Sequence, residues 1–208
     1  MAWFRVGAVL MAVVTTMRVA AAGSGVSAAS LVRPGDVVLG NPRGRVTIVD
    51  FYDTSCMPCR AMNRRIERMI REDPQIRYVP IDVPILGPQS VLGAKALVAA
   101  RMQGQFHAMH AELMRQRRLP TRAVLRADAA RLGFDVPRFM RDLAGAHAAR
   151  VVDADLRRAA AMRLRYVPVV YIGRNRIPGA MSFRDLDWLV HHAGEQVVTE
   201  IVGPPDPS

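Results

Sequence analysis

The stretch VTIVDFYDTSCMPC, residues 46–59, decides the fold, because a strand pattern passes directly into a pair of cysteines. Residues 46–52 are rich in β-branched and aromatic side chains and predict a buried strand. After the cysteines, apolar side chains recur at helical spacing, at Ala61, Met62, Ile66, Met69 and Ile70. Cys56 and Cys59 are the only two cysteines, so any thiol chemistry belongs to this pair. A C-x-x-C between a strand and a helix predicts a redox-active dithiol.

Composition sets the broad class of the protein. The chain has 208 residues, half of them hydrophobic, which suffices for one well-buried domain or one domain with an insertion. Its net charge of +11 is almost wholly arginine, since Lys95 is the only lysine. The arginines are scattered and form no run of five or six, so we interpret them as a solvated basic surface and expect no nucleic-acid partner. No glycine-rich phosphate loop, G-x-S-x-G or paired-carboxylate motif supports nucleotide or hydrolase chemistry.

The first residues have the layout of a secretory signal peptide. Arg5 precedes an apolar stretch at residues 6–14, and small residues follow at 20–22 and 27–29. We expect cleavage between Ala22 and Ser30 and export to the periplasm. An uncleaved membrane anchor is the alternative, although Arg18 interrupts the apolar stretch. In an oxidising compartment a lone C-x-x-C is expected to act on the thiols of other proteins.

The remaining chain alternates strand and helix signals. Residues 30–41 predict an extended lead-in, residues 76–81 a second strand parallel to the first, and residues 88–150 a run of helices. Further signals predict N-caps at Thr121 and Asp135, a strand at 167–172, a short strand around 176–177, and a helix after a capping box at 182–185.

Together these residues resemble the DsbA-like thiol:disulfide oxidoreductases over about residues 40–193. The matching marks are DFY at 50–52, CMPC at 56–59, VP at 167–168, YIG at 171–173 and IPG at 177–179. Within that family, GNPRG at 40–44 and PILGP at 84–88 are most similar to the exported copper-tolerance oxidoreductases of the ScsC type.

The resemblance implies an α/β protein with a thioredoxin-like fold and a helical insertion between the second and third core strands. The chain would then divide into a signal peptide at 1–29, thioredoxin-like parts at 30–87 and 151–202, a helical insertion at 88–150, and a disordered tail at 203–208.

The family assigns different roles to the two cysteines. Cys56 is the expected nucleophile, because a helix N-terminus favours thiolate over thiol and should hold its pKa below the free value of about 8.5. Cys59, one turn further in, would resolve the mixed disulfide. A zinc half-site is the alternative, but a structural site needs four ligands. We therefore expect no metal, and no cofactor besides the Cys56–Cys59 disulfide.

The residues between the cysteines set the redox poise. The strongest oxidants of the family carry Pro then His, whereas this chain has Met57 and Pro58. Without the imidazole the Cys56 thiolate is less stabilised, so we predict a less oxidising couple. Met57 and Pro58 are also expected to contact substrate.

Three further residues are expected at the site. Asp50 is an acid in an apolar strand, and by family resemblance it helps move the proton of Cys59; the alternative is a carboxylate bonded to a backbone amide. Pro168 matches the family's cis-proline, and the backbone of Val167 would pair with extended substrate. Copper binding by His107 and His110 is conceivable, but the nearby methionines are more typical of core packing.

The resulting prediction is an exported enzyme that exchanges disulfides with protein substrates. Oxidase and reductase directions stay open, and a disulfide isomerase or a non-catalytic copper-binding protein of the same fold are alternatives. The expected partners are unfolded or cysteine-containing exported proteins and a membrane protein that re-oxidises or reduces the pair. Because the lead-in is too short for an oligomerising extension, we expect a monomer.

Overall fold

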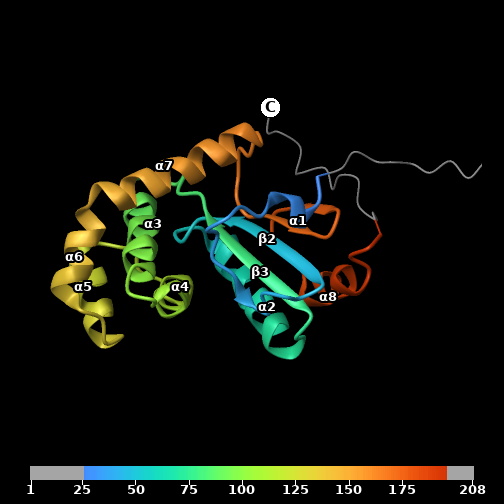
Figure 1. The fold of residues 1–208 in the computed structure, drawn as a ribbon, viewed down its shortest axis with the longest axis horizontal. Coiled ribbons are helices and arrows are strands. Elements are labelled where there is room, and N and C mark those ends of the chain that lie inside the picture. Colours follow the sequence, from blue (N-terminus) through green and yellow to red (C-terminus); the bar gives the residue numbers. More distant parts are fainter. Residues whose placement is uncertain (1–25, 196–208) are drawn as a thin grey trace, which may run out of the picture.

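A five-stranded sheet with the order β1-β3-β2-β4-β5 forms the centre of the fold (Figure 1). The structure is a computed structural model that describes residues 26–195, so the predicted tail and most of the predicted signal peptide lie outside it. The elements are α1 (Ala28–Leu31), β1 (Leu39–Gly40), β2 (Val46–Tyr52), α2 (Met57–Glu72), β3 (Ile76–Asp82), α3 (Pro88–Arg101), α4 (Phe106–Arg115), α5 (Arg122–Arg131), α6 (Val136–Ala144), α7 (Ala146–Ala161), β4 (Val169–Ile172), β5 (Asn175–Pro178) and α8 (Phe183–His191).

The predicted strand β2 is the central strand. It pairs in parallel with β3, from Val46 opposite Ile76 to Tyr52 opposite Asp82, and antiparallel with β4 on its other side. All of its residues after Val46 are buried, which explains the nearly continuous apolar sequence. Because β2 and β3 are parallel, the loops that follow them leave from the same edge of the sheet.

Helices cover both faces of the sheet. On one face α2 and α8 pack against β-strand side chains in a cluster that includes Ile48, Met62, Ile66, Ile172 and Leu189. The other face packs against α1 and the end of α7, around Phe51, Val79 and Tyr171. The layers confirm the predicted thioredoxin-like fold.

Helices α3 to α6 form the predicted insertion between β3 and β4, beside one end of the sheet (Figure 1). Their apolar side chains share a cluster with Tyr52, Cys56 and Cys59, so the insertion packs directly behind the cysteine pair. Helix α7 then leads back to the sheet (Figure 1). This helix is continuous through residue 150, the predicted end of the insertion.

The predicted caps are present. Thr121 accepts a hydrogen bond from the N–H of Val124, and Asp135 accepts one from the N–H of Arg138. At the start of α8, Ser182 accepts from the N–H of Asp185, which is one half of the predicted capping box. The Asp185 carboxylate accepts from the Ser182 hydroxyl, whereas in a capping box it would accept from the backbone N–H of the N-cap residue. Within residues 26–195, no helix combines the length and the apolar character that crossing a membrane requires.

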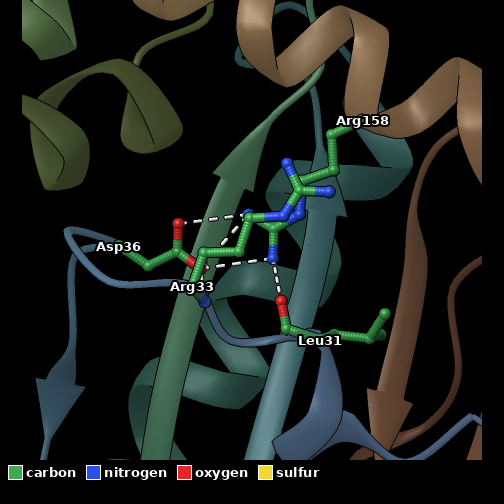
Figure 2. A network of polar contacts seen from close by, with 4 residues as sticks. All are labelled: Leu31, Arg33, Asp36 and Arg158. Atoms are coloured by element: carbon green, nitrogen blue, oxygen red, sulfur yellow. Dashed lines mark hydrogen bonds and ion pairs between the residues drawn. The ribbon is translucent and has the colours of Figure 1, made fainter.

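The lead-in is more structured than the extended segment predicted for residues 30–41. It begins in α1, and β1 pairs antiparallel with β3. Arg158 of α7 binds both carboxylate oxygens of Asp36, at 3.1 and 3.2 Å, and also donates to the carbonyl of Leu31 (Figure 2). The backbone N–H of Arg33 donates to Asp36 at 2.8 Å. These contacts hold the lead-in against α7, and sequence patterns gave no sign of them.

Candidate redox site

Cys56 and Cys59 form a disulfide at the N-terminus of α2. Cys56 is the N-cap residue, and the backbone N–H of Cys59 donates to its sulfur at 3.1 Å. Both cysteines are buried, Cys59 completely and Cys56 with 5% of its surface exposed. When the pair is reduced, this N–H and the positive end of the helix favour negative charge on the sulfur of Cys56 rather than on Cys59.

Asp53, which sequence reasoning missed, fixes the loop that carries Cys56. Its backbone carbonyl accepts from the N–H of Cys56 at 3.0 Å, and its carboxylate accepts from the N–H of Ser55 at 2.7 Å and of Leu86 at 3.1 Å. The side chain is fully buried. Asp53 thereby ties the loop after β3 to the cysteine loop. The available signal was the sequence Asp-Thr-Ser directly before Cys56, because aspartate is favoured at the first position of a turn.

Arg60 is a second residue that sequence reasoning missed. It directly follows Cys59, is only 6% exposed, and donates through Nε to the carbonyl of Thr54 at 2.8 Å. Burial lowers the pKa of the guanidinium, and the charge of Asp53 partly offsets that effect. Arg60 therefore holds the backbone two residues before Cys56 from the helix side.

The predicted substrate-binding residues surround the sulfur of Cys56. The carbonyl oxygen of Val167 lies 3.7 Å from it, and the Val167–Pro168 peptide bond is cis, as the resemblance implied. The carbonyl of Pro168 accepts from the N–H of Gly179 at 2.8 Å, which fixes this loop to the end of β5. Met57 is 72% exposed, and Pro58 is exposed beside it. A partner sulfur approaching Cys56 would meet these groups.

Asp50 is fully buried in β2, and its contacts lead toward α2. The hydroxyl of Tyr78 lies 3.2 Å from an Asp50 carboxylate oxygen and 3.4 Å from the side-chain oxygen of Asn63. Asn63 is buried one helical turn after Cys59, on the same face of α2. Burial raises the pKa of Asp50 from 3.8 to about 7, and the hydrogen bond from Tyr78 opposes that rise. Asp50 can thus gain or lose a proton near neutral pH.

His107 and His110 come together with Glu67 of α2 but have the surroundings of a packing contact. The ring nitrogens lie 3.5 and 4.0 Å from the Glu67 carboxylate. His110 is fully buried, packs edge-on against Tyr52 and stacks on Phe106, and burial lowers its pKa from 6.5 to about 3. In the described part of the chain, no group of three or more His, Cys, Asp or Glu side chains could hold a metal ion.

A disulfide at the start of a helix, beside a cis-proline loop on a thioredoxin-like sheet, defines the class of thioredoxin-fold redox proteins. A family model described as Thioredoxin matches residues 33–192, and the chain belongs to that family. A thioredoxin-like oxidoreductase from Silicibacter pomeroyi DSS-3 has 29% identity and a TM-score of 0.72, covering 78% of this chain and 94% of its own.

Further comparisons concern the ScsC-type proteins and the curated relatives. The catalytic domain of Proteus mirabilis ScsC shares the fold, with 17% identity and a TM-score of 0.69 over 76% of this chain and 88% of that one. The ScsC and DsbA-like structures, at 17–22% identity, share the fold of this chain. Among curated relatives, the Na(+)/H(+) antiporter NhaA 1 of Salinispora arenicola is 28% identical over 160 residues, which are 76% of this chain and 24% of the antiporter. The chain thus spans about a quarter of the length of the curated relatives it matches.

Proposed function

We propose that this protein is an exported enzyme that exchanges disulfides with cysteine-containing proteins through Cys56. One observation carries the proposal: the sulfur of Cys56 sits at the N-terminus of α2, 3.7 Å from the carbonyl of Val167. The helix end stabilises the thiolate as nucleophile and as leaving group. The backbone beside Val167 would pair with an extended substrate, whose main chain would bind without regard to its sequence.

In the oxidising direction, a substrate thiolate attacks the sulfur of Cys56 and the Cys56–Cys59 bond breaks. Cys59 leaves as a thiolate and takes up a proton, for which Asp50 is the proposed donor. A second substrate thiolate then attacks the substrate sulfur of the mixed disulfide, and Cys56 leaves as a thiolate. Two electrons pass from the substrate to the cysteine pair. The substrate thiols release their protons to solvent, Cys59 takes one proton from Asp50, and Asp50 regains a proton from solvent; the reducing direction reverses each step.

The proposed activity is tested by catalysed reduction of insulin and by refolding of a scrambled disulfide protein. The native protein should accelerate at least one of these reactions, and Cys56→Ser should abolish the effect. If both proteins behave alike while the substitution removes copper binding, the copper-binding alternative is correct. Thiol trapping in cells then gives the direction: a mainly oxidised pair indicates an oxidase, and a mainly reduced pair a reductase or isomerase.

Export is part of the proposal, and contacts of α1 favour one range of cleavage sites. Ala28 is fully buried, and its N–H donates to the carbonyl of Gly173 at 2.6 Å, while Ser27 caps α1. Cleavage after residues 27–29 would remove these contacts, whereas cleavage after Ala22 would retain them. We therefore expect a mature N-terminus between Gly23 and Ser27. The intact mass of the periplasmic protein measures it, and a start after Ala28 would contradict this expectation.

A monomer and a membrane redox partner complete the proposal. The short lead-in contacts α7 and β3 of its own chain. Because these contacts hold it within one molecule, we expect a monomer. Sedimentation of the mature protein checks the monomer, and a stable trimer would instead favour the isomerase alternative. Covalent trapping of the Cys59→Ser variant in membranes checks for the partner.

A further inference from the structure

Three loops that are far apart in the sequence border the cysteine loop. The loop at 83–87 is tied to it by the hydrogen bond from Leu86 to Asp53, and the loop at 163–167 by the approach of Val167 to Cys56. The loop at 116–120 and the cysteine loop both contact α3 at Gly93. A methyl group at Gly93 would lie 2.5 Å from Thr54 Oγ1 and 3.3 Å from Pro120 Cγ, so both residues pack on the same backbone. We call these three loops, with residues 54–58, the rim.

The rim exposes apolar side chains. Among the described residues eight large apolar side chains are exposed, and five of them belong to the rim. These five are Met57, Ile85, Leu86, Leu119 and Tyr166, with exposed fractions between 41% and 72%. Such a concentration around one buried sulfur marks a surface that contacts a partner.

All charged side chains of the rim are positive. Arg117, Arg118, Arg163 and Arg165 are exposed there, and none of the four segments contains an aspartate or glutamate. Two carboxylates directly precede rim segments, Asp53 and Asp82; Asp53 is fully buried and accepts two backbone hydrogen bonds, and both carboxylate oxygens of Asp82 are buried. The rim therefore presents apolar contacts surrounded by guanidinium groups, which attract carboxylates and bind them bidentately.

We propose that the rim selects polypeptide segments that carry acidic residues beside the reactive cysteine. The inference rests on the function proposed above and adds the substrate class. Apolar rim residues would contact the segment next to its cysteine, and the arginines would speed its approach and hold its carboxylates. An anionic membrane surface could attract the same charges, but the rim surrounds the sulfur of Cys56, which a protein thiol must reach.

Two matched charge reversals test this inference. Arg117→Glu with Arg118→Glu changes the rim. Arg43→Glu with Arg45→Glu makes the same change in net charge at exposed positions just before β2, at the opposite end of that strand from Cys56. Two peptides of equal length, each with one cysteine flanked either by glutamates or by lysines, supply the thiols. The rate of mixed-disulfide formation with the oxidised protein is measured, normalised to each peptide's reaction with a small disulfide.

The native protein should react about tenfold faster with the glutamate peptide at low ionic strength, and this preference should shrink as salt screens the charges. The rim variant should lose or reverse the preference, and the Arg43 and Arg45 variant should keep it. Equal loss in both variants, or equal rates with both peptides, would overturn the inference while leaving the proposed function intact. Loss of binding to anionic vesicles in the rim variant, with unchanged peptide rates, would also overturn it. Failure of both peptides to form a mixed disulfide would refute the proposed function itself.

Discussion

The carbonyl oxygen of Val167 lies 3.7 Å from the sulfur of Cys56, although 111 residues separate them in the chain. The fold makes this contact because β4, which begins just after Val167, is the antiparallel neighbour of β2, which ends just before the cysteine loop. The sulfur of Cys56 and the backbone of Val167 are thus supplied by the ends of adjacent strands of one sheet. In the proposed function an extended substrate would lie across Cys56, while Cys59 is buried beneath it.

The burial of Cys59 leads to a prediction about the mixed disulfide. In Cys59→Ser the hydroxyl cannot attack the bond between Cys56 and a substrate, so covalent adducts should accumulate. Non-reducing electrophoresis followed by mass spectrometry measures them and identifies the substrates. Cys56→Ser is the matched control and should form none, because Cys59 is inaccessible to a protein thiol. Adducts of equal abundance in both variants would show that Cys59 is also a nucleophile.

Met57 and Pro58 lead to a prediction about the redox potential. Replacing them by Pro and His places an imidazole beside Cys56 and stabilises its thiolate, and hence the reduced form of the pair. The potential should rise by tens of millivolts, since about 30 mV corresponds to about 1.4 kcal/mol. Equilibration with a glutathione buffer measures it. Met57→Ala adds no imidazole and should leave the potential near that of the native protein, whereas an unchanged potential in the Pro-His variant would refute the prediction.

Local signals in the sequence sufficed for much of the fold and for the cysteine pair. The run at 46–52 and the caps at Thr121 and Asp135 are determined by the side chains of a few neighbouring residues, and each is present in the structure. Val167 and Pro168 came from the family resemblance, because nothing in their local sequence relates them to Cys56.

Other parts depend on contacts that no local pattern describes. Asp53 and Leu86 lie 33 residues apart, and Asp36 and Arg158 lie 122 apart. Tyr78 looks like an ordinary strand residue in the sequence, yet its hydroxyl joins Asp50 to Asn63. A polar side chain on a buried face shows that a partner is needed, but the sheet order decides which residue provides it.

Asp50 leads to a prediction about pH. Its pKa is raised from 3.8 to about 7 by burial, so the folded protein binds more protons than the unfolded chain between these values. Stability from this group is complete below pH 3.8 and is lost as pH rises through about 7. Asp50→Asn lacks this titration. Between pH 4 and 8 the free energy of unfolding of the native protein should fall by on the order of 4 kcal/mol relative to that of the variant, measured by urea unfolding.

A kinetic readout separates a proton-transfer role of Asp50 from a structural one. The rate at which the mixed disulfide is resolved should show an inflection near pH 7 in the native protein and none in Asp50→Asn. Tyr78→Phe removes the hydrogen bond that lowers the pKa of Asp50, so the inflection should move to higher pH. An inflection that stays in place in both variants would exclude Asp50 as the titrating group.

The ion pair between Arg158 and Asp36 leads to a prediction about stability (Figure 2). The Arg158 side chain is 1% exposed, and its guanidinium carbon lies 5.6 Å from the centre of the Phe51 ring. If one member of the ion pair is removed, few water molecules can therefore reach the other. Arg158→Met leaves the Asp36 carboxylate, whose side chain is only 12% exposed, without its ion-pair partner. The free energy of unfolding should fall by about 3–5 kcal/mol, measured by urea denaturation.

A double-mutant cycle with Asp36→Asn shows whether that cost comes from the pair or from the loss of packing by the arginine stem. The double variant should lose less free energy of unfolding than the two single variants lose together. The difference should be about 0.5–3 kcal/mol, because in the double variant neither partner is left charged and unpaired. The exposed pair between Arg184 and Asp185 is the control, and Arg184→Met should change the unfolding midpoint little. Strictly additive single losses would instead mean that Arg158 holds the lead-in by its contacts with Leu31 and Phe51 alone.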